Sequence, residues 1–285
     1  MATVVEKKSC ARQAWEMLTA GGSSLDAVQE AVRVMEDSGV LNAGRGSVLN
    51  HEGFAELDAA VMNGNGRTAG AVAAVRHVAN PIDMARLVMD EGKHVLLAGP
   101  GAERFAIERG MSLVPDGYFV TERRRKELNE AIDADLHPHK GPFSSCHPMG
   151  TVGAVALDSH GDLAAATSTG GLTNKRYGRV GDSPLVGAGT YAENGVCAIS
   201  CTGAGEYFIR YAAASDVCAR VKYQGKSIVT AAQEVLSQLQ AAGGVGGMIV
   251  VDAAGNVTMP YSSPSMLHGE ASEGLSIAIY GVPER

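Results

Sequence analysis

The sequence predicts an α/β protein built as a four-layer α/β/β/α sandwich. Apolar residues make up 45 % of the 285 residues, enough for a large core. Short apolar segments typical of strands alternate with segments of helical period, which favours sheets covered by helices on their outer faces. The strands are rich in Ala, Val and Gly, so they can pack closely on both sides. A doubly wound parallel sheet remains the alternative, because periodicity alone does not separate the two.

In the first half, the elements follow from apolar spacing and from turn residues. Helices are expected over residues 6–20, from Ser23 or Ser24 through Met35, and over 81–91, 102–110 and 121–133. Strands are expected over 54–62 and 68–75, with a buried strand over 94–99. Asn63-Gly64-Asn65-Gly66 is a strong hairpin signal between the first two strands. Residues 135–150 carry three prolines and almost no core residues, which predicts a mobile linker.

The second half begins with a sharp change in composition. Strands are expected over 151–158, 162–169, 196–202, 246–252, 257–261 and 275–281. Helices are expected over 204–222 and 227–240. Residues 170–190 are predicted to be a glycine-rich loop. The whole chain, 1–285, is expected to form a single domain.

Charge and hydropathy exclude several classes of function. The net charge is −7, without the basic surplus of a nucleic-acid-binding protein. No apolar run approaches the ~20 residues of a membrane span. The start, MATVVEKKSCARQ, lacks the pattern of a secretory signal, so a cytoplasmic location is expected.

The five cysteines are odd in number and have no metal-ligand spacing, so reduced thiols are expected. Cys197 and Cys201 lie on one face of a predicted strand, too far apart for a disulfide. Histidines and a cysteine in the predicted linker are zinc ligands by type, but their irregular spacing favours a solvated loop over a metal site. These residues are His137, His139, Cys146 and His147.

The junction at Gly150 and Thr151 is where the predicted linker ends at a strand. A threonine at a strand start is usually a β-former or a cap. However, a threonine freed at its amino terminus is a complete catalytic unit. Its hydroxyl is the nucleophile, and its α-amine, with a pKa near ~7.7–8.0, is the base. Cleavage after Gly150 would release that unit.

Around this junction the sequence resembles the plant-type L-asparaginases, or isoaspartyl aminopeptidases, which are N-terminal nucleophile hydrolases. The resemblance is carried by MGTVGAVALDSHGDLAAATSTGGLTNKRYGRVGDSPLVGAG and SCTGAGE. It extends over roughly residues 10–260 through GGSSLDAVQEAVRVMED, NAGRGSVLN, ELDAAVMNG, AGAVAAV, ANPIDMARLVM and GGMIVVD. The resemblance implies the four-layer sandwich and a threonine hydrolase that needs no cofactor.

The resemblance implies that Thr151 is exposed by self-cleavage of the Gly150–Thr151 bond, giving an α chain of residues 1–150 and a β chain of residues 151–285. Thr169 would be a second hydroxyl that orients the nucleophile. Its plain alternative is an ordinary threonine at the end of a strand.

The resemblance also assigns the binding groups. Arg179 and Asp182 would bind the α-carboxylate and α-ammonium of the substrate, and Asn42 would help to shape the site. Thr202 and Gly203 would form the oxyanion hole through a hydroxyl and a backbone N–H. The plain alternatives are a local surface ion pair for the Arg-x-x-Asp spacing and a helix cap for Thr202.

Relatives of this kind hold a sodium ion through backbone carbonyl groups. The matching positions are Met35, Glu36, Ser38, Leu41, Ala43 and Arg45. The implied reactions are hydrolysis of L-asparagine to aspartate and ammonia and cleavage of β-aspartyl dipeptides. The implied assembly is a dimer of cleaved α/β units.

The sequence departs from this family at its front. The family opens with a strand and a His-Gly-Gly segment, whereas this sequence starts inside the following helix. The alternative expectation is therefore an uncleaved, inactive short form that at most pairs with full-length subunits.

Overall fold

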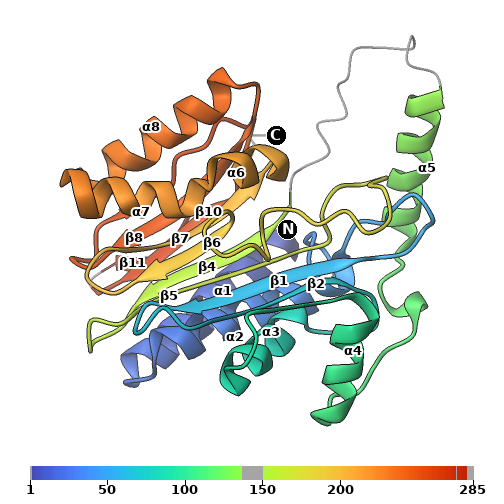
Figure 1. Cartoon of the computed structure of the whole chain (residues 1–285), viewed down its shortest axis with the longest axis horizontal. Helices are drawn as coiled ribbons and strands as arrows, with labels where there is room; N and C mark the ends of the chain where they lie inside the picture. The colour runs from blue at the N-terminus through green and yellow to red at the C-terminus, as the bar shows by residue number, and fades with distance from the viewer. Residues whose placement is uncertain (1, 137–149, 274, 281–285) are drawn as a thin grey trace.

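Two facing β-sheets form the centre of the protein (Figure 1). The computed structural model describes residues 2–136, 150–273 and 275–280. The first sheet has the order β3-β2-β1-β5-β4 and the second the order β6-β7-β8-β9. Their strands are β1 (Leu57–Asn63), β2 (Ala69–Val75), β3 (Leu96–Ala98), β4 (Val152–Leu157), β5 (Leu163–Thr169), β6 (Thr190–Glu193), β7 (Cys197–Gly203), β8 (Gly246–Asp252) and β9 (Val257–Thr258).

Strand pairing excludes the doubly wound alternative. Every pair in the two sheets is antiparallel except β2 with β3. A doubly wound fold requires parallel neighbours joined by helical crossovers. Here β1–β2 and β4–β5 are hairpins, and the first is the one that the Asn-Gly repeat predicts.

Helices cover the outer face of each sheet, which completes the predicted α/β/β/α sandwich (Figure 1). The first sheet is covered by α2 (Ser24–Asp37), α3 (Pro81–Glu91) and α4 (Gly99–Glu108). The second is covered by α7 (Ala213–Gln224) and α8 (Ile228–Ala241). The Ser23 hydroxyl accepts the Asp26 N–H and caps α2, which resolves the choice between Ser23 and Ser24.

The remaining elements lie around this sandwich. Helix α1 (Ala2–Thr19) packs on α2 and on a separate hairpin of β10 (His268–Ser272) and β11 (Leu275–Tyr280). Helix α5 (Glu122–Leu136) leads to the junction, and α6 (Gly205–Tyr211) follows β7. Two short 3₁₀ turns, η1 (Gly44–Gly46) and η2 (Asp116–Tyr118), complete the described chain.

Among the described residues, three hydrophobic clusters lie at the interfaces between the four layers. One joins α2, α3 and α4 to the first sheet, and another joins α7 and α8 to the second. The third lies between the sheets and is smaller, with Met62, Leu163 and Ala198 among its members. The two sheets therefore pack directly on each other.

Three local predictions were wrong. The expected helix over 204–222 is two helices, because Ala212 adopts a left-handed backbone conformation with φ 47°. The expected buried strand over 94–99 is the shorter edge strand β3, in which Leu96 is 39 % exposed; Val95, just before it, is 54 % exposed. The expected linker over 135–150 starts later, because α5 continues to Leu136; residues 137–149 lie outside the described residues.

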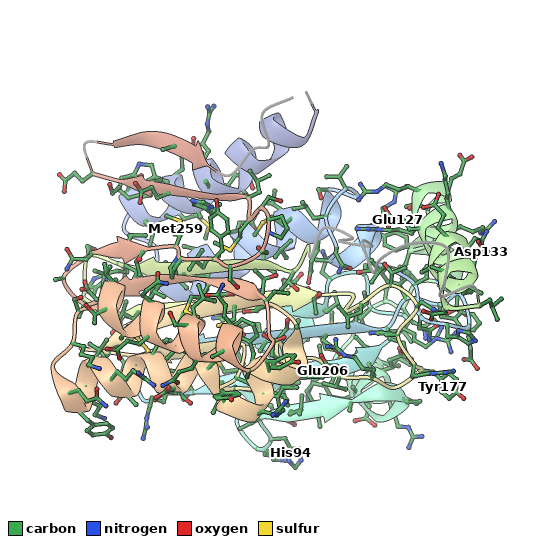
Figure 2. The ribbon with its side chains drawn as sticks, turned by 90° about the horizontal axis from the view of Figure 1, so that it is seen from above. His94, Glu127, Asp133, Tyr177, Glu206 and Met259 are labelled. Carbon is green, nitrogen blue, oxygen red and sulfur yellow. A yellow bond between two sulfur atoms is a disulfide. The ribbon has the colours of Figure 1, made fainter. Side chains whose placement is uncertain are left out.

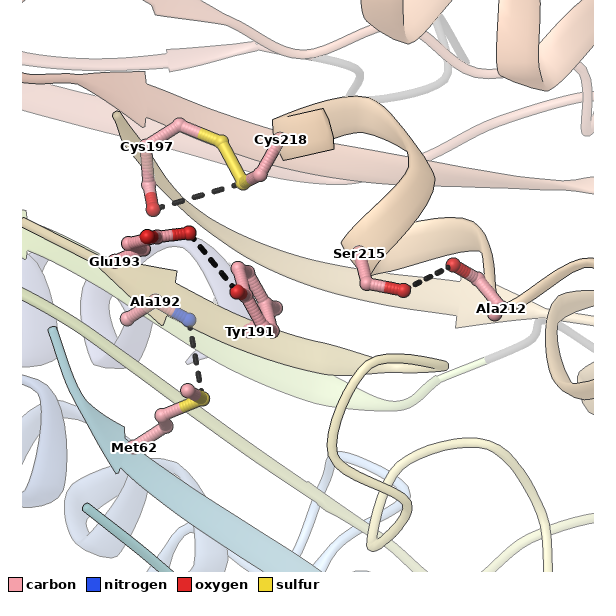
Figure 3. Close-up of a disulfide and its surroundings, with 8 residues drawn as sticks. All are labelled: Met62, Tyr191, Ala192, Glu193, Cys197, Ala212, Ser215 and Cys218. Atoms are coloured by element: carbon pink, nitrogen blue, oxygen red, sulfur yellow. Dashed lines mark hydrogen bonds between the residues drawn. A yellow bond between two sulfur atoms is a disulfide. The ribbon is translucent and has the colours of Figure 1, made fainter. Parts of the chain in front are cut away.

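The cysteines also differ from the expectation of reduced thiols. Cys197 on β7 and Cys218 on α7 form a disulfide (Figure 3). Their Cα atoms are 5.8 Å apart, within the ordinary range for such a bond. The pairing follows from the packing of α7 on β7, which strand periodicity does not reveal. Cys201 stays a buried thiol whose pKa burial raises well above its usual range.

The described residues contain neither a cluster of metal-ligating side chains nor a helix that could cross a membrane. Within residues 2–136, 150–273 and 275–280, no three His, Cys, Asp or Glu side chains gather as metal ligands. None of the helices in these ranges is long and apolar enough to cross a bilayer. The zinc alternative at His137, His139, Cys146 and His147 lies outside the described residues.

Candidate active site

The hydroxyl groups of Thr151 and Thr169 face each other at one edge of the first sheet. Antiparallel pairing of Val152 with Ser168 places the preceding and following residues side by side. The Thr151 hydroxyl donates to Thr169 Oγ1 at 3.0 Å, and the Gly171 N–H donates to the same oxygen at 3.0 Å. Thr169 is only 2 % exposed. The Thr151 hydroxyl is thus held in one orientation by a buried neighbour.

A buried hydroxyl layer lies directly behind this pair, between the two sheets. Gly153 pairs with Thr167 in the first sheet, and Thr190 pairs with Ser200 in the second. Thr167 Oγ1 is 2.7 Å from Ser200 Oγ and 2.6 Å from Thr190 Oγ1. Gly153 packs so closely on Ser200 Oγ that a Cβ has no room there. These contacts fix the sheets relative to each other beside the Thr151–Thr169 pair.

Strands β5 and β7 run in the same direction across this interface, so their ends meet at one edge. The Leu163 N–H at the start of β5 donates to the Asn194 side chain, just before β7, at 2.8 Å. The hydroxyl layer joins the same two strands further along. Thr169 at the end of β5 and Thr202 at the end of β7 therefore lie at the same edge of the sandwich.

Thr202 and Gly203 are the last two residues of β7, and the Thr202 hydroxyl is left without a hydrogen bond in the described chain. Thr202 Oγ1 is buried and has no hydrogen-bond partner among the described residues. Gly203 has φ +149°, and a Cβ at this position would be 2.5 Å from the Val245 carbonyl oxygen. Only glycine fits there. The N-cap of α6 is Ala204, so the interpretation of Thr202 as a helix cap is wrong.

Arg179 and Asp182 do not form the local surface ion pair that their spacing suggests. Arg179 binds Glu206 instead, through two N–O contacts of 2.9 Å (Glu206 is labelled in Figure 2). Asp182 is 5 % exposed, and its Oδ2 has no hydrogen-bond partner in the described chain. Burial raises the pKa of Asp182 to about 7. Both groups flank Gly205, the first residue of α6. A Cβ atom added to Gly205 would lie 3.0 Å from Arg179 Nη2 and 2.7 Å from Asp182 Oδ1.

A second group of charged residues, missed by the sequence analysis, holds the loop that carries Arg179. Lys175 is 5 % exposed and donates to the Glu56 carbonyl oxygen at 2.7 Å. The Glu56 carboxylate accepts the Gly178 N–H at 3.0 Å, and Asp58 accepts the Gly181 N–H at 3.3 Å. Burial lowers the pKa of Lys175 and raises that of Asp58. The signal in the sequence was the presence of two carboxylates, Glu56 and Asp58, at the start of an otherwise apolar strand.

Asn42 joins the Gly150–Thr151 junction to the loop after β5. Its backbone N–H donates to the Gly150 carbonyl oxygen at 3.2 Å, and its carbonyl accepts the Gly170 N–H at 3.2 Å. Its side-chain amide donates to the Gly171 carbonyl oxygen at 2.8 Å. The structure therefore places Asn42 against the junction itself.

The six positions expected to bind sodium lie at the end of α2 and in the loop after it. The Met35 carbonyl accepts the Ser38 hydroxyl at 2.8 Å, and the Ala43 carbonyl accepts the Gly46 N–H at 3.1 Å. The Glu36 side chain points elsewhere. Its Oε1 accepts the Ser168 hydroxyl at 2.6 Å, and burial raises its pKa well above the usual range. Its Oε2 is buried without a hydrogen-bond partner among the described residues.

Comparisons with known proteins identify the family to which this chain belongs. The family model described as asparaginase matches residues 2–279. The chain is 51 % identical over 271 residues to an isoaspartyl peptidase of Salmonella typhimurium, covering 93 % of this chain and 87 % of the relative. It is 47 % identical over 263 residues to an isoaspartyl peptidase/L-asparaginase of Bos taurus, covering 91 % and 83 %. The chain belongs to the asparaginase family.

Proposed function

We propose that this protein hydrolyses L-asparagine to aspartate and ammonia and cleaves β-aspartyl dipeptides, with Thr151 as the nucleophile. The relatives named above support both substrates. The observation that carries the proposal is that Thr202 Oγ1 and Asp182 Oδ2 are buried without partners in the described chain, with Thr202 at the same edge of the sandwich as the Thr151–Thr169 pair. Native proteins rarely leave such atoms unsatisfied, so these two await a ligand.

The chemistry is acyl transfer through a threonine ester. The Thr151 hydroxyl attacks the side-chain carbonyl carbon of the substrate, and its proton passes to the free α-amine of the same residue. The Thr202 hydroxyl and the Gly203 N–H donate to the oxyanion that forms. The amine returns the proton to the leaving ammonia or amino group. Water then hydrolyses the β-aspartyl ester, which releases aspartate and restores Thr151.

Recognition rests on the α end of the substrate, which carries one positive and one negative charge. The guanidinium of Arg179 binds the α-carboxylate as a planar fork. The carboxylate of Asp182 binds the α-ammonium. Both groups contact Gly205, two residues after Gly203, so the bound α end lies close to the oxyanion donors.

Self-cleavage would generate the α-amine. The Thr151 hydroxyl attacks the Gly150 carbonyl carbon, the peptide nitrogen becomes the new amine, and water hydrolyses the resulting ester. The Asn42 N–H at 3.2 Å from the Gly150 oxygen supports this step, because it can stabilise negative charge on that oxygen.

Intact mass and ammonia release test the proposal together. After incubation, the purified protein is expected to give two fragments that meet at Gly150 and Thr151, and to release ammonia from L-asparagine. A single species at 29.4 kDa without ammonia release would contradict the proposal and favour the uncleaved, inactive alternative.

A structural sodium ion in the loop after α2 is part of the proposal. The residues fit such an ion, because a carbonyl oxygen has two lone pairs and the bonds to Met35 and Ala43 use one each. The carbonyls of Met35, Glu36, Ser38, Leu41, Ala43 and Arg45 would hold it. The ion would rigidify the segment that carries Asn42 and would take no part in the reaction.

Sodium is therefore expected to raise the melting temperature by a few degrees relative to choline at equal ionic strength, since a ligand that binds only the native state stabilises it. Differential scanning fluorimetry in the two chloride salts measures this. Identical melting temperatures in sodium and choline would remove the ion from the proposal. Assembly as a dimer of cleaved units and a cytoplasmic location stay predictions.

A further inference from the structure

We propose that Glu206 is a positioning residue that keeps the guanidinium of Arg179 apart from Asp182, so that each remains available for its own end of the substrate. The inference rests on the proposed function, because it assigns those two groups to the α-carboxylate and α-ammonium. Glu206 itself contacts neither end.

The ion pair with Glu206 occupies one edge of the Arg179 guanidinium and leaves the other edge, the unused edge, without a hydrogen bond in the described chain. Glu206 Oε1 accepts from Nε and Oε2 accepts from Nη2, both at 2.9 Å. The other edge, with Nη1, has no hydrogen-bond partner among the described residues. A Cβ on Gly181 would be 2.8 Å from Nη1, and one on Gly171 would be 3.4 Å from it. The unused edge thus faces the segment between Thr169 and Asp182.

Without Glu206, Asp182 is the natural partner for this guanidinium. Asp182 is buried with Oδ2 unpaired in the described chain, and its Oδ1 flanks the same Gly205 as Arg179 Nη2. A buried carboxylate that lacks partners attracts a neighbouring cation strongly. Rotation of Arg179 onto Asp182 would neutralise both binding groups, and a substrate would first have to separate them. A bidentate bond to Glu206 opposes that rotation.

The charges around Asp182 support a second consequence of the same arrangement. Burial is the main cause of the raised pKa of Asp182; Arg179 opposes it, while Asp58 and Glu206 add to it. The Cys201 thiol also lies close enough for Asp182 to raise its pKa. Removing the Glu206 charge and bringing Arg179 nearer both lower the pKa of Asp182. In a variant without the Glu206 charge, the rise of kcat/KM on the acidic side of the pH profile should therefore occur at lower pH than in the wild type.

Glu206→Gln tests the inference in the full-length, incubated protein. We expect KM for L-asparagine to rise about tenfold, with kcat changed less than about twofold, because only the binding of the α end is impaired. The pH midpoint of kcat/KM should fall at the same time. Glu234→Gln is a matched control, because Glu234 on α8 is a partly exposed carboxylate that pairs with Arg220 on α7. It should leave KM, kcat and the pH midpoint unchanged.

Calorimetry with L-aspartate, which carries the same α end, separates this inference from the proposed function. About tenfold weaker binding to the Glu206→Gln variant than to the wild type is expected. Wild-type binding and pH midpoint in that variant would overturn the role of Glu206 while leaving the hydrolase intact. A wild-type protein that binds aspartate but releases no ammonia would contradict the proposed function alone.

Discussion

Replacing Thr151 with alanine is expected to abolish both hydrolysis of L-asparagine and cleavage after Gly150. The substitution removes the only hydroxyl that donates to Thr169 in the described chain, at 3.0 Å. Loss of a covalent nucleophile leaves only binding and oxyanion stabilisation, so the rate should fall by about 10⁴-fold or more. Ammonia release measures the first effect, and intact mass measures the second.

Thr151→Ser is the matched control, because serine keeps the hydroxyl and the α-amine and loses only a methyl group. It should cleave and retain measurable turnover. Normal cleavage and turnover in Thr151→Ala would rule out this residue as the nucleophile in both reactions.

Asp182→Asn should weaken the enzyme and stabilise the fold. A neutral amide cannot pair with the α-ammonium, so kcat/KM for L-asparagine should fall by about 10²–10³-fold, the usual cost of removing one partner of a buried charge pair. The wild type should show kcat/KM rising as pH increases through about 7, because only the ionised form of Asp182 binds the ammonium. Initial rates between pH 5 and 9 measure both effects.

The stability gain follows from the raised pKa of Asp182 in the native state, about 7 against an ordinary 3.8. Between these values the native state binds more protons than the unfolded state, so stability falls as pH rises from about 4 to about 7. Above pH 7 the full penalty is present, at most about 4 kcal/mol. Asp182→Asn removes it.

Urea unfolding of Asp182→Asn should therefore give a higher unfolding free energy than the wild type at pH 8, with a smaller difference at pH 5. Asp216→Asn on the surface of α7 is the control, because Asp216 is partly exposed and pairs with Arg220. It should change neither activity nor stability by much. Equal unfolding free energies of Asp182→Asn and the wild type at pH 8 would mean that the buried charge of Asp182 does not destabilise the native state.

Much of the fold could be predicted because its signals are local. Alternating apolar residues and Asn-Gly turns define the hairpins, and a serine at residue 23 marks the start of α2. The break at Ala212 was not predictable, because a run of alanines favours a continuous helix and tertiary packing decides its backbone conformation. The Cys197–Cys218 disulfide likewise depends on how α7 lies on β7.

The candidate site shows the same division between local and long-range information. Thr151, Thr169 and Thr202 each stand at a strand end, so the sequence could place them on one edge once the strand order was assumed. The partner of Arg179 could not be found this way. Spacing suggests Asp182 three residues on, whereas the structure pairs Arg179 with Glu206 from helix α6, 27 residues away in the sequence.

The pairing of β1 with β5 means that the proposed cleavage would leave the first sheet built from two separate chains. β1 precedes the Gly150–Thr151 junction and β5 follows it, yet the two strands pair over Asp58–Asn63 and Ala164–Thr169. Helix α2, also from before the junction, packs on β4 and β5. After the proposed cut, the fragment that follows Gly150 would keep the whole second sheet and its cluster with α7 and α8, but neither fragment would retain the complete first sheet or the core beneath it. The mature protein should therefore be an obligate two-chain unit whose fragments melt together and complement each other only as a pair.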